Sequence, residues 1–305
     1  MILPDFQLPS RVNHCCLYSG IDSYDYCMDK QHFLQYPYRI IYQFNSRGFR
    51  DSEWPSHIHD LQKAIWCVGD SFTVGIGQPF DHTWPQVLQR AIGSRVINVS
   101  MDGASNDWIS RRARQIREQI DPLLIVVMWS YTHRREQVDS SRNDEDRRIA
   151  TSRVTDIGDF KHWIKLVKSV RNDPGEIIEC TIPLFCPITE IANAWNSVRD
   201  PSWGDLPQDA AAFDLLNDRI KQELQTQHQC FDRFENFFRN LDPTVSMSDL
   251  QMPSGITQVR SMLDWARDYH HFDILTSEWV VARILVRIRE RNLSKNFPLV
   301  ASVEQ

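Results

Sequence analysis

The strongest constraint on the fold is a series of short apolar runs that alternate with segments of helical periodicity. Residues 64–68 form one run, residues 95–99 carry a second strand pattern, and a fourth lies within residues 176–185. The third run, residues 123–129, contains no polar residue. Such a run is typical of a strand that is covered on both faces. Strands that alternate with helices predict a parallel sheet between helical layers.

The segments between these runs carry apolar side chains at helical spacing. Thr83 can cap a helix that Gly93 ends. Asp107 can cap the next helix, and further helices are expected over residues 160–167 and 277–292. The apolar face of the helix after Asp107 is formed by Ile109, Ala113, Ile116 and Ile120. We therefore expect an α/β domain of the flavodoxin-like, three-layer α/β/α type.

One domain with several additions accounts for the whole chain. Residues 1–60 are rich in Tyr and Phe and are predicted to pack on the core as an N-terminal extension. The α/β domain is expected over residues 61–293. It would include a charged loop at residues 134–159 and a mainly helical insertion at residues 186–263, and a tail would follow at residues 294–305.

Composition excludes several classes of protein. The 34 Lys and Arg residues are outnumbered by 40 Asp and Glu, and the net charge of −6 argues against sequence-independent binding of nucleic acid. The longest apolar run, residues 123–129, is too short to span a membrane. The first residues lack the basic and apolar regions of a signal peptide. We therefore expect no nucleic-acid or membrane partner, and the oligomeric state stays open.

The seven cysteines indicate reduced thiols rather than disulfides. Their number is odd and no Cys-x-x-Cys pair occurs, so a cytoplasmic location is expected. Two short segments, residues 14–16 and 57–59, combine His and Cys or two His residues. Neither has a matching pair at ligand spacing, so no metal site is predicted. Most of the 10 Trp residues are expected in the core, although some could stack on sugars.

The first chemical signal is Ser71, within the segment Val-Gly-Asp-Ser-Phe-Thr that directly follows the predicted strand at residues 64–68. A serine there lies at the carboxyl edge of the sheet, where α/β proteins bind their ligands. The P-loop pattern is excluded because Gly-Lys-Ser/Thr is absent. The Gly-x-Ser-x-Gly elbow is excluded because Thr73 stands in place of the second glycine. Ser71 could also simply cap the helix that follows.

The second signal is the pair Asp268 and His271, which comes just before the last predicted helix. A histidine with an aspartate three residues earlier can be a general base and the acid that orients it. Serine catalysis needs such a pair because a free hydroxyl is a poor nucleophile. The neighbouring His270 is the competing candidate for the base.

With these blocks the sequence resembles the SGNH (GDSL-type) hydrolase family. Gly69-Asp70-Ser71 matches the block that supplies the nucleophile, and Asn98 to Gly103 matches the block whose glycine N–H helps to form the oxyanion hole. Asp268-x-x-His271 matches the block of acid and base. The segment Asn45-x-x-Gly48-Phe49-Arg50 looks like the lead-in found in one branch of the family. The resemblance covers roughly residues 40–135 and 264–290, and it implies the fold of an SGNH hydrolase.

One family block is not matched. After the third strand the family usually has Gly-x-Asn-Asp, whose asparagine donates to the oxyanion. Here Thr132 stands roughly at that position, and Asn106 could supply an amide instead. Loss of one oxyanion donor typically lowers the rate by a factor of about 10²–10³. The predicted oxyanion hole therefore consists of Ser71 and Gly103, with Asn106 or Thr132 as a third donor.

The resemblance and the site chemistry together predict a serine esterase or acyl hydrolase that acts on a small ester or an acylated carbohydrate. The mechanism would use Ser71, His271 and Asp268 and would need no cofactor and no metal. Arg134 and Arg135 could bind an anionic group of the substrate or lie on a solvated loop. Two alternatives stay open: an O-acyltransferase with the same triad, and a binding module that keeps the fold but has lost activity.

Overall fold

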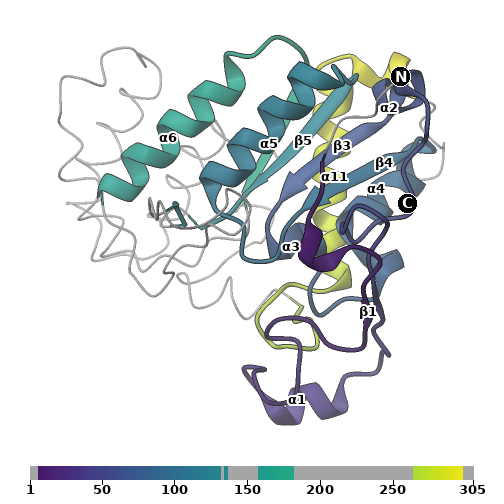
Figure 1. Cartoon of the computed structure of the whole chain (residues 1–305), viewed down its shortest axis with the longest axis vertical. Helices are drawn as coiled ribbons and strands as arrows, with labels where there is room; N and C mark the ends of the chain where they lie inside the picture. Colours follow the sequence, from purple (N-terminus) through teal and green to yellow (C-terminus); the bar gives the residue numbers. More distant parts are fainter. Residues whose placement is uncertain (1–5, 132–133, 137–156, 182–263, 298–305) are drawn as a thin grey trace.

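The computed structural model of this chain describes residues 6–131, 134–136, 157–181 and 264–297 (Figure 1). The predicted helical insertion at residues 186–263 lies outside the described residues. So do Thr132, most of the predicted charged loop and most of the predicted tail.

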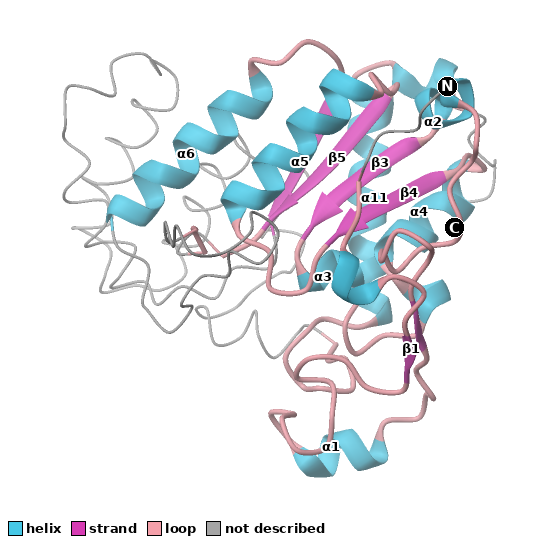
Figure 2. Cartoon of the chain, in the orientation of Figure 1, coloured by secondary structure: helices cyan, strands magenta, loops and turns pink. Residues whose placement is uncertain are grey.

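The central sheet has four described strands, all parallel. They are β3 (Ile65–Gly69), β4 (Val96–Ser100), β5 (Leu124–Trp129) and β6 (Ile177–Thr181). Their order in the sheet is β4-β3-β5-β6 (Figure 2). Counted along this sheet, the order is 2-1-3-4, which is that of flavodoxin-like folds. The last residues of β3 and β4 are paired, since Gly69 lies opposite Ser100.

Helices cover both faces of this sheet. The helices α5 (Asn106–Gln119) and α6 (Ile157–Arg171) lie on one face, and α4 (Trp84–Ile92) and α11 (Ile274–Glu290) lie on the other (Figure 1). Successive residues of a strand point to opposite faces. Accordingly Trp66 packs toward α5, whereas Ile65 and Cys67 pack toward α4 and α11. The predicted three-layer α/β/α fold is confirmed.

Several helix boundaries differ from the predictions. The cap of α5 is Ser105, whose Oγ accepts a hydrogen bond of 2.9 Å from the N–H of Trp108, so the prediction of Asp107 was wrong by two residues. Asp107 instead accepts hydrogen bonds from Glu136 N and from His162 Nε2. The helix α6 begins at 157, inside the predicted loop, and α11 begins three residues earlier than expected. The helix α4 does follow Thr83 and end at Gly93.

The N-terminal extension packs partly on the core and partly beside the carboxyl edge of the sheet. Phe6, Leu8 and Phe49 belong to the apolar cluster beneath α5 and α6. The short strands β1 (Cys15–Cys16) and β2 (Tyr42–Gln43) pair antiparallel. They form, with α1 (Lys30–Gln35), a lobe below α3 (Ser71–Val74) in Figure 1. The remaining short helices are η1 (Pro9–Arg11), α2 (Ile58–Lys63), η2 (Phe80–His82) and η5 (Leu293–Asn296).

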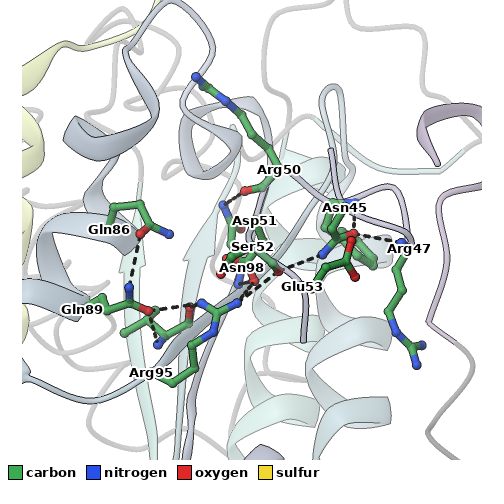
Figure 3. A network of polar contacts seen from close by, with 12 residues as sticks. Asn45, Arg47, Arg50, Asp51, Ser52, Glu53, Gln86, Gln89, Arg95 and Asn98 are labelled. Carbon is green, nitrogen blue, oxygen red and sulfur yellow. Dashed lines mark hydrogen bonds and ion pairs between the residues drawn. The ribbon is translucent and has the colours of Figure 1, made fainter. Parts of the chain in front are cut away.

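The segment from Asn45 to Arg50 joins the extension to the sheet. The side chain of Asn45 accepts hydrogen bonds from Arg47 N and Phe49 N, which fixes a tight turn (Figure 3). Directly after the turn, the buried Asp51 carboxylate pairs with Arg95 at 2.7 Å and accepts from the N–H of Asn98 in β4. The guanidinium of Arg50 points away from this network in Figure 3.

None of the helices in the described part of the chain combines the length and apolarity that a membrane crossing requires.

Candidate active site

Ser71 lies at the sharp turn between β3 and the short helix α3, at the carboxyl edge of the sheet. Asp70 is the N-cap residue of α3, and its carboxylate accepts a hydrogen bond of 3.0 Å from the N–H of Phe72. Gly69 allows the turn because a Cβ at this position would lie 2.0 Å from the hydroxyl of Thr73. The sequence therefore forces the chain to turn with Ser71 as the first helical residue.

The loop before α11 brings Asp268 and His271 to this serine. His271 Nε2 lies 2.7 Å from Ser71 Oγ, and His271 Nδ1 lies 2.5 Å from Asp268 Oδ2. The other oxygen of Asp268 accepts the backbone N–H groups of His270 and His271, which fixes the carboxylate in place. All three side chains are buried. The hydroxyl, the imidazole and the carboxylate thus form one continuous chain of hydrogen bonds.

The charges around His271 favour its protonated form. Burial lowers the pKa of His271, but the adjacent carboxylate of Asp268 raises it by more, and Asp102 and Asp70 add to this effect. The result is a pKa above the ordinary value of 6.5. Burial raises the pKa of Asp268. The charge of His271 and its hydrogen bonds to this carboxylate lower that pKa by more, so it lies below the ordinary range of an aspartate. Asp268 is therefore ionised at neutral pH and can stabilise an imidazolium.

Two backbone N–H groups at the carboxyl edge of the sheet, those of Ser71 and Gly103, are available to a ligand. In the described part of the chain, neither Ser71 N nor Gly103 N donates a hydrogen bond to another protein atom. Gly103 follows β4 and has a φ of +73°, which favours glycine. A Cβ at Gly103 would meet nothing within 4 Å, so this residue borders open space. Free N–H groups of this kind can stabilise a developing oxyanion.

The contacts of Asn106 do not support the prediction that it donates to an oxyanion. Its amide nitrogen donates to the carbonyls of Tyr131, at 2.9 Å, and Ser130, at 3.5 Å. Its amide oxygen accepts from the N–H of Ser130 at 2.9 Å. The side chain is thus occupied in joining the start of α5 to the end of β5. The alternative, Thr132, lies outside the described residues and stays a prediction.

Arg134 lies beside the nucleophile turn. Its Nη1 is 3.9 Å from Asp70 Oδ2, and its guanidinium lies over the ring of Tyr131. Within the described part of the chain, its buried Nη1 and Nε make no hydrogen bond. Asp70 also accepts a hydrogen bond from the hydroxyl of Ser130. Arg135, the next residue, is partly exposed.

Sequence patterns missed several residues around the site. No spacing rule indicated that Asp70 would be shared by Ser130 and Arg134, or that Asp102 would lie near enough to His271 to raise its pKa. The segment containing Asp102 was noted only for its glycine. Among the described residues, no group of three or more His, Cys, Asp or Glu side chains could hold a metal ion.

No family model and no curated protein sequence matches the chain. Solved structures that match it include lipolytic proteins of the G-D-S-L family and carbohydrate esterases. A GDSL-family lipolytic protein from Veillonella parvula is 15% identical, with a TM-score of 0.37 over 73% of this chain and 96% of that one. A lipase/acylhydrolase from Enterococcus faecalis is 13% identical, with a TM-score of 0.36 over 78% and 99%.

A third match is a family two carbohydrate esterase from Clostridium thermocellum, whose structure was solved in complex with cellohexaose. It is 11% identical, with a TM-score of 0.38 over 76% of this chain and 65% of that one. Both the sequence identities and the TM-scores of these matches are low. The fold assignment therefore stands on the strand order and helical layers of the chain itself.

Proposed function

We propose that this chain is a carboxylic ester hydrolase of the SGNH type, with Ser71 as nucleophile, His271 as general base and Asp268 as the residue that orients the base. One observation carries the proposal: the unbroken chain of contacts from Ser71 Oγ through the His271 ring to Asp268 Oδ2. A serine hydroxyl, an imidazole and a carboxylate in this order are what nucleophilic catalysis by serine requires.

The geometry supports a two-step reaction. His271 Nε2 takes the proton from Ser71 Oγ while this oxygen attacks the ester carbonyl. His271 then gives the proton to the leaving alcohol, and an acyl-enzyme remains. Water attacks the acyl-enzyme in the second step, with His271 again acting as base. Asp268 keeps the Nδ1 proton of the imidazole in place and stabilises the positive charge that forms.

The oxyanion of each tetrahedral intermediate is assigned to the N–H groups of Ser71 and Gly103. Both groups lack a partner within the described part of the protein. Ser71 N additionally lies at the start of α3, where backbone N–H groups of a first turn are unpaired. Such donors act chiefly when charge develops, so they lower the barrier more than they tighten substrate binding.

We propose a small ester or an acylated carbohydrate as substrate. A substrate with an anionic group on its acyl or alcohol part is favoured by Arg134, because two buried nitrogens of its guanidinium make no hydrogen bond to the described residues. Arg135, the next residue, is proposed as a second contact of this group. We place the protein in the cytoplasm, since none of the five cysteines of the described residues forms a disulfide.

The proposal is tested by Ser71→Ala, assayed with an activated acetyl ester. Turnover should fall by roughly 10³-fold or more, because the nucleophile is gone. The circular dichroism spectrum should stay unchanged. Ser110→Ala is the matched control, because Ser110 is a buried serine on α5 whose hydroxyl forms a hydrogen bond with Ser169. Full turnover in Ser71→Ala would contradict the proposed mechanism.

Two further measurements distinguish a hydrolase from an acyltransferase and from a binding module without activity. A fluorophosphonate should label Ser71 in a hydrolase or an acyltransferase, whereas a binding module that has lost activity would not react. Products formed with and without a sugar acceptor then separate hydrolysis from acyl transfer, because the same acyl-enzyme can react with water or with a sugar hydroxyl.

A further inference from the structure

A buried polar network connects the N-terminal extension with the loop that carries the triad acid and base. The carboxylate of Asp22 is fully buried. Its Oδ1 accepts from Arg267 Nε at 2.8 Å, and its Oδ2 accepts from Arg267 Nη2 at 2.6 Å. The same Oδ2 accepts from the hydroxyl of Tyr42 at 2.5 Å. Arg267 directly precedes Asp268, so the ion pair is one residue away from the triad.

The same network reaches the loop that follows the nucleophile. The hydroxyl of Tyr42 accepts a hydrogen bond of 2.7 Å from the N–H of Gly77. The guanidinium of Arg50 lies 4.4 Å from the ring centre of Tyr42. It donates to the carbonyls of Gly75 and of Gln78, the latter at 2.8 Å. These acceptors lie in residues 74–78, which continue directly from the helix of Ser71.

The two loops also meet directly at Gly77. Its carbonyl accepts from the N–H of Arg267 at 3.1 Å. A Cβ at Gly77 would lie 2.6 Å from the side chain of Ala266, so the loops are in close contact. The extension adds one more backbone bond, from the N–H of Met28 to the carbonyl of Asp268 at 3.0 Å. The nucleophile loop and the acid–base loop are thus both attached to the extension.

We propose that Asp22 and Tyr42 are positioning residues for the triad, and that with Arg50 and Arg267 they form a brace which sets the acid–base loop against the nucleophile loop. Ser71 and His271 are 200 residues apart in the sequence, and their contact depends on how these two loops are placed. A buried carboxylate is costly unless it is paired and hydrogen-bonded, and Asp22 satisfies both conditions through residues of the site. This inference rests on the proposed function for its catalytic readout.

The first test is kinetic and is made at pH 8. Asp22→Asn keeps the shape of the side chain but leaves Arg267 without its counter-ion. Tyr42→Phe removes only the hydroxyl that connects Asp22 with Gly77. Each variant should lower kcat by about 10-fold or more with little change in KM, because a misplacement of about 1 Å in a catalytic group can cost about 10²-fold. Asp51→Asn is the matched control, since Asp51 is an equally buried carboxylate of the extension whose partner is Arg95 (Figure 3).

The second test does not need turnover. The ring of His271 is titrated by nitrogen NMR in the wild-type protein and in each variant. The charged groups that act most strongly on this ring are Asp268 on its own loop, Asp102 after β4 and Asp70 after β3, and none of them changes. Tyr42→Phe alters no charge at all. A fall in the His271 pKa in this variant would therefore report a looser contact with Asp268.

The outcomes separate the brace from a purely structural role. The proposal is supported if Asp22→Asn and Tyr42→Phe lower kcat and the His271 pKa while Asp51→Asn affects only thermal stability. It is overturned if the brace variants lower only the unfolding temperature, as the control does. If Asp22→Asn does not fold, Tyr42→Phe decides the question. If the wild-type protein hydrolyses no ester but the His271 titration still shifts, the brace stands and the proposed function fails.

Discussion

The imidazole of His271 is the group whose titration should govern the pH dependence of the proposed reaction. It must be neutral to accept the proton of Ser71, and contact with Asp268 raises its pKa above 6.5. We therefore expect kcat/KM for a neutral ester to rise with pH and to level off above an apparent pKa that is higher than 6.5. A rate profile between pH 5 and 9 measures this value. A midpoint below 6.5 would contradict the direction of the shift.

The adjacent histidines give an internal control for this assignment. His271→Ala should reduce turnover by roughly 10³-fold or more, since it removes the only base in contact with Ser71 Oγ in the described structure. His270→Ala should retain most of the activity, because the Asp268 contact of His270 is made by its backbone N–H. The opposite result would show that the wrong histidine has been assigned.

At the scale of residues, the catalytic side chains were more predictable from the sequence than the residues that hold them in place. Ser71, Asp268 and His271 follow recognisable local patterns, and the structure brings them together. Asn106 was a poor candidate because spacing alone does not show where an amide points. Asp22 carries no local signal, since its partners Tyr42 and Arg267 lie 20 and 245 residues away in the sequence.

At the scale of elements, Asn106 fastens α5 to the end of β5. Its side chain makes both a donor and an acceptor bond to the segment Ser130–Tyr131. Asn106→Ala would leave buried backbone groups unpaired, so we expect the free energy of unfolding to fall by about 1–3 kcal/mol. Urea denaturation followed by fluorescence measures the loss. Ser110→Ala, on the same helix, should lower the free energy of unfolding by much less. Equal losses in the two variants would show that the hydrogen bonds of Asn106 to Ser130 and Tyr131 contribute no special stability.

The elements themselves were largely predictable because apolar periodicity depends on local sequence. Residues 123–129 indicated a doubly covered strand, and β5 is buried between two helical layers. The ends were less predictable, since Ser105 and Asp107 are both good cap residues. The structure uses Ser105 because Asp107 accepts instead from Glu136 N and His162, and these partners are remote in the sequence.

At the scale of the whole molecule, two ion pairs with buried carboxylates attach the extension to different parts of the α/β domain. The pair of Asp51 and Arg95 connects it with the amino end of β4. The pair of Asp22 and Arg267 connects it with the acid–base loop. Part of this arrangement carried a sequence signal, the Asn45–Arg50 segment. In the structure Asn45 fixes the turn, and Arg50 donates hydrogen bonds to carbonyls within residues 74–78.

The stability of the whole protein should depend on pH through another carboxyl between the extension and α11. Asp273 precedes α11, and Tyr36 of the extension donates its hydroxyl to both carboxylate oxygens at 2.7 Å. Burial raises the pKa of Asp273 to about 7; the bond from Tyr36 opposes the shift, and the nearby charge of Asp264 adds to it. An acid with a raised pKa binds its proton more tightly when folded, so stability falls as pH rises from about 4 to about 7.

Asp273→Asn tests this expectation because it removes the ionisation and keeps an acceptor for Tyr36. The variant and the wild-type protein should be about equally stable at about pH 3.5, where Asp273 is largely protonated in both the folded and the unfolded state. At pH 8 the variant should be more stable by about 1–3 kcal/mol, since the wild-type protein must then ionise a buried carboxyl. Some slope should persist in the variant, because Asp51, with a pKa of about 6, and His271 both lose stabilising protons in the same range. Urea unfolding curves at the two pH values measure the difference, and parallel losses in both proteins would remove Asp273 as the cause.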